Sequence, residues 1–146
     1  MAANTQPIYV ESVIHWRKKL AGTEVVPRTP TTTAPILVGS AGDFGAMIHG
    51  IDVQHLGNNV ATVLRVYTQP KSQTAYDLEF EIDLAAVTTA SESVGISKVT
   101  FANLPTIVSG TLQNRALHLE PGESLYIALG TVIASGINVF IRGGNY

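Results

Sequence analysis

The closing thirty residues, 117–146, constrain the fold of this chain more than any other stretch. Within 125–129 and again within 137–141, large aliphatic residues occupy alternate positions, and smaller, polar or aromatic residues lie between them. Strand side chains repeat with period two, so both segments are typical of β-strands with one buried face. Pro121 and Gly122 suit the centre of a type II turn. The stretch therefore predicts a hairpin between residues 117–119 and 125–129, followed by a terminal strand.

The rest of the chain carries the same kind of pattern in short segments separated by turns. Further candidate strands are 36–38, 47–53, 60–68, 77–84, 97–101 and 106–108. Gly and Asn at 57–59 tolerate positive φ, so we expect a hairpin between 47–53 and 60–68. Met47, Ile51 and Val53 are expected on one face of it. About eight short strands with regular turns are typical of an all-β protein, a single antiparallel β-sandwich or jelly roll.

Residues 77–84 show the cleanest alternation in the chain. Leu78, Phe80, Ile82 and Leu84 are expected on one face, and the other face is expected to carry Asp77, Glu79, Glu81 and Asp83. Carboxylates at alternate strand positions lie close together, so they could bind a hard cation or act as a paired acid and base. A merely solvated face is the commoner arrangement, and we favour it. A third hypothesis places Arg17, Lys18 and Lys19 of a neighbouring subunit against these carboxylates.

Two parts are predicted along the chain, an N-terminal arm over residues 1–26 and a β-sandwich domain over residues 27–146. Prolines within 27–35 remove backbone donors and favour an extended segment at the domain surface. In the arm, Ile8, Val10, Ile14 and Trp16 fit one face of a strand, but the segment also fits helical spacing. We favour an extended arm with some helical turn. These four residues, the basic triplet, the four acidic residues and Tyr146 are the predicted subunit or partner contacts.

Composition narrows the choice of partner. Charged residues make up 14% of the chain, against about a quarter in soluble domains, so further copies or a large partner are expected to cover part of the surface. The net charge of −2 disfavours nucleic acid, because nucleic-acid binders usually carry a basic surplus. No window approaches the roughly 18 apolar residues of a membrane span. The absence of cysteine excludes a disulfide framework and a thiol nucleophile.

No arrangement of residues predicts an enzyme. The four histidines, His15, His49, His55 and His118, lack the His-X-His pair of a metal-dependent jelly-roll enzyme of the cupin type. All four are expected at the surface or satisfied in the core. A Gly-X-Ser-X-Gly elbow is missing, and the loop 39–45 lacks the Gly-Lys-Ser/Thr ending of a phosphate-binding loop. We therefore predict no catalytic residue, no metal and no cofactor.

Five segments together carry a resemblance to a known family. They are the Thr-Pro-rich stretch 27–35, the segments MIHGIDVQHLG and VATVLRVYT within 47–68, the LHLEPGESLYIALG segment, and the closing Gly-Gly-Asn-Tyr. The layout resembles the jelly-roll decoration or cement proteins of tailed-bacteriophage capsids. Many of these end in Gly-Gly-Asp-Tyr, and Asn145 stands here in place of the Asp.

The resemblance implies a non-enzymatic virion protein of the outer capsid surface, synthesised in the host cytoplasm. Such a protein would assemble as a homotrimer and clamp subunits of the major capsid protein, with the arm as a clasp that orders on binding. A jelly-roll protein of the tail or fibre that binds a receptor or glycan is the alternative. At the C-terminus, Gly143 and Gly144 are expected to permit a tight bend that docks Tyr146.

Overall fold

A computed structural model of the chain describes residues 12–91, 93, 95–96, 98–101, 104–108 and 111–146, with the backbone alone over 100–115. These residues form strands and loops and contain no helix, so none that could span a membrane. The strands are β1 (Ser12–Leu20), β2 (Ile36–Ser40), β3 (Ala46–His55), β4 (Thr62–Gln69), β5 (Asp77–Leu84), β6 (Val99–Phe101), β7 (Leu104–Val108), β8 (Thr111–Arg115), β9 (Leu117–Leu119), β10 (Ser124–Leu129) and β11 (Ile137–Asn145).

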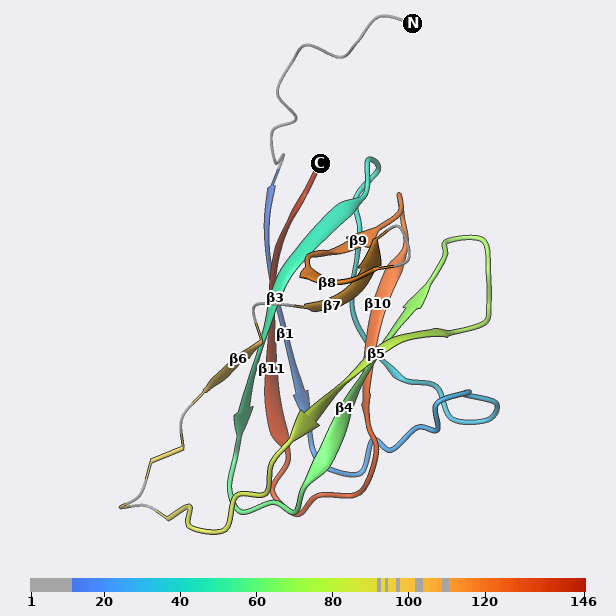
Figure 1. The fold of residues 1–146 in the computed structure, drawn as a ribbon. Helices are drawn as coiled ribbons and strands as arrows, with labels where there is room; N and C mark the ends of the chain where they lie inside the picture. The colour runs from blue at the N-terminus through green and yellow to red at the C-terminus, as the bar shows by residue number, and fades with distance from the viewer. Residues whose placement is uncertain (1–11, 92, 94, 97, 102–103, 109–110) are drawn as a thin grey trace, which may run out of the picture.

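Two antiparallel sheets pack face to face (Figure 1). Sheet A has the strand order β1-β11-β3-β6, and sheet B has the order β2-β10-β4-β5. In addition, β9 pairs with β3, and β7 pairs with β8 as a separate hairpin. From β1 to β4 successive strands alternate between the sheets, with β1 and β3 in sheet A and β2 and β4 in sheet B. The last two strands alternate again, with β10 in sheet B and β11 in sheet A. This is the order of a jelly roll, in which eight strands form two Greek keys. The predicted single β-sandwich of about eight strands is confirmed.

The core between the sheets is almost wholly aliphatic. β10 and β11 are interior strands of their sheets, and their alternate residues are fully buried: Leu125, Ile127, Leu129, Ile137, Val139 and Ile141. Burying an aliphatic side chain of this size contributes about 1.5–3 kcal/mol. The alternation in the closing thirty residues therefore marks the centre of the core, as predicted.

The segment 12–20 belongs to sheet A. β1 pairs with β11 along its whole length, from Ser12 opposite Asn145 to Leu20 opposite Ile137. Ile14 and Leu20 are buried in the core. The prediction of an arm with some helical turn is thus wrong for this segment, because the partner strand that selects the strand pattern lies at the far end of the sequence. Residues 1–11, with Ile8 and Val10, lie outside the described residues.

Two predicted hairpins are instead connections between the sheets. β3 lies in sheet A and β4 in sheet B, so the turn at 57–59 crosses from one sheet to the other. Pro121 and Gly122 likewise join β9, which pairs with β3, to β10 in sheet B. The turn type itself is confirmed, since the N–H of Glu123 donates to the carbonyl of Glu120 at 3.0 Å and Gly122 has φ +72°. A turn fixes the local backbone geometry, but it does not specify which sheet each of its two flanking strands will join.

A bulge in β3 changes which residues face the core. Gly50 lies opposite Arg142 and Ile48 opposite Gly143, so His49 is an extra residue without a counterpart in β11. One extra residue reverses the side-chain alternation. Ile48 and Ile51 are therefore both buried, and Met47 is only half-buried. The expectation that Met47 shares a face with Ile51 is wrong for this reason.

Candidate functional site

The first candidate surface is the β1 edge of sheet A. Trp16 is half-buried, and its indole covers Gly39 of β2 so closely that a Cβ at residue 39 would lie 2.3 Å from the ring. Ile14 is buried in the core, so it is not available as the subunit contact that we predicted. Trp16 closes the sandwich between β1 and β2, and its role as a subunit contact stays a prediction. Arg17, Lys18 and Lys19 are exposed on the same strand. The guanidinium of Arg17 lies 5.7 Å from the ring centre of Phe140 on β11.

The second candidate surface is β5, the edge strand of sheet B. Val66 lies opposite Phe80 and Tyr67 opposite Leu78, so Glu79 is the extra residue of a bulge. As a result Leu78 leaves the core and packs beside Tyr67 on the outer face of the sheet. The four carboxylates do not share one face, because this bulge breaks the alternation. The predicted continuous acidic face is wrong, although Asp77, Glu79 and Asp83 remain exposed.

Glu81 is held within the molecule. Its carboxylate accepts two hydrogen bonds from Arg28, at 3.0 and 2.9 Å, and one from Arg65 at 2.7 Å. The hydrogen bonds from Arg28, and after them those from Arg65, lower the pKa of Glu81. Arg65 also donates to the carbonyl of Val26. Glu81 therefore fastens the segment after β1 to sheet B, and it is not free to bind a cation or a neighbouring lysine.

The basic and acidic edge strands lie on opposite sides of the sandwich. β1 is the first strand of sheet A and lies beside β2, as the contact of Trp16 with Gly39 shows. β5 is the last strand of sheet B and lies beside β6, since Leu84 and Val99 line one cavity. One lateral edge carries the basic triplet and the other carries three exposed carboxylates. Such a distribution suits head-to-tail contact between copies of the chain.

Tyr146 occupies the end of sheet A near the β2–β3 loop. Its backbone N–H donates to the carbonyl of Gly45 at 3.2 Å, and its ring stacks on that of His118 with centres 6.4 Å apart. The preceding Asn145 accepts from the N–H of Gly42 at 3.2 Å and donates to Ser12 at 3.1 Å. Both residues fasten the C-terminus to the domain.

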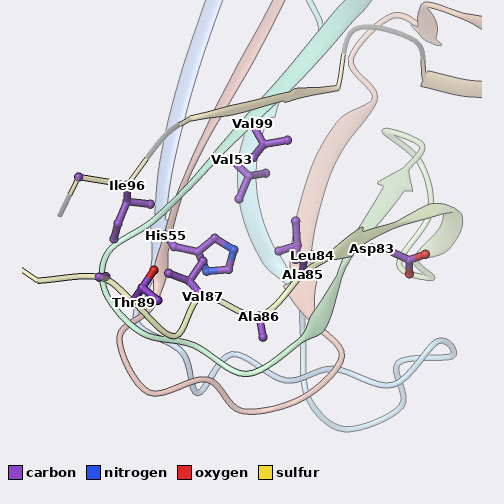
Figure 2. A pocket seen from close by; sticks show the side chains of 12 residues that line it. Val53, His55, Asp83, Leu84, Ala85, Ala86, Val87, Thr89, Ile96 and Val99 are labelled. Atoms are coloured by element: carbon purple, nitrogen blue, oxygen red, sulfur yellow. The ribbon is translucent and has the colours of Figure 1, made fainter.

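The third candidate is a cavity of about 390 Å³ at the edge between β5 and β6. Its wall is mainly apolar, with Val53, Leu84, Val87, Ile96 and Val99 among the lining residues. Figure 2 shows the imidazole of His55 pointing into this apolar surrounding, whereas the carboxylate of Asp83 points away from it. The two side chains therefore do not form an acid and base pair.

His55 is 7% exposed and is a buried polar side chain of the cavity lining. Its Nδ1 lies 3.0 Å from Nδ2 of Asn59. Burial lowers the pKa of His55 below its ordinary value. The prediction of a satisfied core position holds for Nδ1, but the cavity was not predicted. The sequence contained a signal for the burial of His55, because Ile51, Val53 and His55 occupy alternate positions of one strand and so share a face. Asn59, which contacts the imidazole, follows four residues later.

The described side chains offer little for catalysis. His15, His49 and His118 are exposed. Among the residues whose side chains the structure describes, no three His, Asp or Glu side chains converge in a way that could hold a metal ion. What the arrangement can do is bind, through the two charged edges and through the cavity.

Comparison with family models, with curated proteins and with solved structures found no match for this chain.

Proposed function

We propose that this chain is a non-enzymatic virion structural protein, a capsid decoration protein that binds the assembled head lattice as a homotrimer and stabilises it. The observation that supports self-association is the placement of opposite charges on opposite lateral edges. A contact from the basic edge of one copy to the acidic edge of the next is heterologous, and three such contacts close a ring when each step turns the chain by a third of a revolution.

Both edges are open along their length in the described part of the chain. β1 is a nine-residue strand that pairs on one side only, and β5 pairs only with β4. Unpaired strand edges carry backbone donors and acceptors that a neighbour can satisfy. Lys and Asp side chains flanking the edges would steer that contact and exclude pairing of like edges. Each pair of exposed charges contributes little alone, so backbone pairing and apolar contact must supply most of the affinity.

Stabilisation of a shell would follow from mass action. A protein that binds the assembled lattice and not its separate subunits lowers the free energy of the lattice. The decrease grows with the ratio of the free protein's concentration to its Kd for the lattice. A trimer engages three sites at once, which raises the effective concentration of each contact. No chemical step is needed.

Light scattering after size exclusion tests the ring. The wild-type chain is expected at about three times its monomer mass of 15.5 kDa, with a shift toward monomer in high salt. Reversing the basic edge (R17E, K18E, K19E) or the acidic edge (D77K, E79K, D83K) should each give monomers. Carrying both reversals on one chain exchanges the edges and should restore the trimer. A double variant that stays monomeric while folded, or a single variant that stays trimeric, contradicts the contact.

Binding to shells is a separate measurement. Wild-type chain should sediment with purified phage heads, hundreds of copies per particle, and should not bind unassembled major capsid protein. A few copies at the tail, together with binding to a glycan array, would instead support the alternative of a tail or fibre protein. Deletion of residues 2–11 tests the proposed clasp and leaves β1 intact, whereas a deletion into 12–20 would remove a strand of sheet A.

A further inference from the structure

The cavity between β5 and β6 has the dimensions of a ligand site. Small-molecule sites usually enclose about 300–1,000 Å³, are lined mainly by apolar side chains, and contain a few polar groups that orient the ligand. This cavity has a volume of about 390 Å³, and His55 is a buried polar side chain in its lining. Val99, which lines it, is 48% exposed, so the cavity lies at the surface of the domain.

The hydrogen-bond network around Asn59 fixes the tautomer of His55. Oδ1 of Asn59 accepts from the N–H of Ser135 at 2.7 Å, which only an oxygen can do. The amide nitrogen then donates to the carbonyl of Gly136 at 2.9 Å and to Nδ1 of His55 at 3.0 Å. Nδ1 is therefore an acceptor, and the proton of the neutral imidazole is on Nε2.

The Nε2–H group is a donor directed into apolar surroundings. Within the described residues it has no hydrogen-bond partner, and Figure 2 shows the free edge of the ring among Val53, Leu84 and Val87. A buried donor without an acceptor is unfavourable, because it has lost its hydration and gained no hydrogen bond. A ligand that brings one acceptor to this position would remove that cost and at the same time bury its own apolar surface.

We propose that this cavity binds a small apolar molecule that carries one uncharged hydrogen-bond acceptor, of the chemical class of an alkyl or aryl ketone. The described lining residues include no Lys or Arg that could compensate a carboxylate or phosphate, so a charged ligand would lose hydration without a counter-ion. Among the lining residues that the structure describes there is also no Trp, Tyr or Phe on which a sugar ring could stack. The acceptor must be a group such as a carbonyl because the imidazole presents only a donor.

Two probes of nearly equal shape test this proposal, acetophenone with its carbonyl and ethylbenzene without one. Titrated into the ¹⁵N-labelled full chain, acetophenone should shift the amide resonances of residues 84–90 and the Nε2 resonance of His55, with saturation in the millimolar range. Ethylbenzene should bind at least fivefold more weakly. Equal affinity for the two probes would overturn the role of Nε2–H, and absence of any shift from 10 mM acetophenone would overturn the site.

Substitutions of two lining residues test whether acetophenone binds in this cavity. Ala86 is exposed and lines the cavity, so A86W should fill the opening and weaken acetophenone at least tenfold without disturbing the core. V99W does the same from the opposite wall. Ala75 is also exposed, in the β4–β5 loop, and is not among the described lining residues, so A75W is the matched control and should bind as the wild type does. Unchanged binding by A86W and V99W would show that the probe lies elsewhere, against the proposal.

Discussion

The side-chain amide of Asn59 donates a hydrogen bond of 3.0 Å to Nδ1 of His55. The same amide group contacts Gly136 and Ser135 in the β10–β11 loop. Asn59 is 3% exposed, so one side chain connects the end of β3, the turn after it and the loop before β11.

Replacing Asn59 by alanine should therefore destabilise the fold strongly. The substitution leaves the N–H of Ser135 and Nδ1 of His55 without partners and removes one of the two hydrogen bonds to the carbonyl of Gly136, which keeps the N–H of Leu56. We expect a loss of about 2–4 kcal/mol in the free energy of unfolding. Denaturant unfolding measures it. Asn58 is the matched control because it is exposed and, among the described residues, its side chain accepts one hydrogen bond, from the N–H of Ala90 at 2.8 Å. N58A should cost less than about 1 kcal/mol; equal losses would contradict the role given to Asn59.

Stability should fall as the pH drops below about 6.5. The pKa of His55 is lower in the folded state than its ordinary value, so between the two values the unfolded chain binds more protons than the folded chain. The contribution of neutral His55 to stability is fully present above its pKa in the unfolded chain. It is lost as the pH falls through the lower pKa of His55 in the folded chain. N59D should reverse the direction, because a carboxylate at residue 59 favours the imidazolium. Unfolding midpoints of both chains from pH 5 to pH 8 measure this, and parallel pH profiles would contradict it.

Glu81→Gln should weaken the attachment of the segment after β1 to sheet B. The amide keeps the shape but loses the charge that two arginines share, and Arg65, whose side chain is only 12% exposed, is left without a counter-ion. We expect a loss of about 1 kcal/mol. Because the pKa of Glu81 is lowered, the loss should be present at pH 7 and disappear as the pH falls through that pKa. R28A removes only the exposed partner and should cost less than E81Q.

Gly143→Ala should disrupt the pairing of β11 with β3. A Cβ at residue 143 would lie 2.1 Å from the carbonyl oxygen of Met47, a backbone atom that cannot move aside without breaking the bulge at His49. Close approach of two strands, and not the bend that we expected, is what requires glycine here. We expect a loss of at least about 2 kcal/mol. G95A is the control, since its Cβ would meet nothing within 4 Å.

Removing Asn145 and Tyr146 should lower the melting temperature by about 3–8 °C, on the scale of about 2–5 °C per kcal/mol for a chain of this length. The deletion removes the hydrogen bonds to Gly42, Ser12 and Gly45 and the ring stack on His118. Y146F keeps the ring and the backbone and should melt as the wild type does. Unchanged melting of the truncated chain would show that the C-terminus does not contribute to stability.

The fold class could be predicted from the sequence, and the connections between strands could not. Period-two alternation at 125–129 and 137–141 is a local property of those residues, and it identified the core strands. Which strand pairs with which is decided by contacts far apart in the sequence, so the hairpins expected at 57–59 and 121–122 were wrong. Segment 12–20 was misinterpreted for the same reason, since its strand pattern was ambiguous until β11 lay beside it.

The candidate surfaces were predicted only in part. The basic triplet and three of the four acidic residues are exposed as expected, but Glu81 is held by Arg28 and Arg65, which lie far from it in sequence. The bulges at His49 and Glu79 leave no mark in the alternation of the sequence, because each is decided by the strand opposite. The cavity beside His55 forms where β3, β5 and β6 meet, and no single segment encodes it.

The pairing of β1 with β11 also governs how the protein can fold as it is made. Ser12 and Asn145, neighbours across the two strands, are 133 residues apart along the chain. β1 leaves the ribosome first and has no partner until β11 follows, so sheet A cannot close during most of synthesis. Such long-range pairing slows folding and exposes unpaired strand edges meanwhile. Completion of the sandwich is therefore expected as one late, cooperative event, and shortening β11 should lower the soluble yield in the cell as well as the stability of the folded chain.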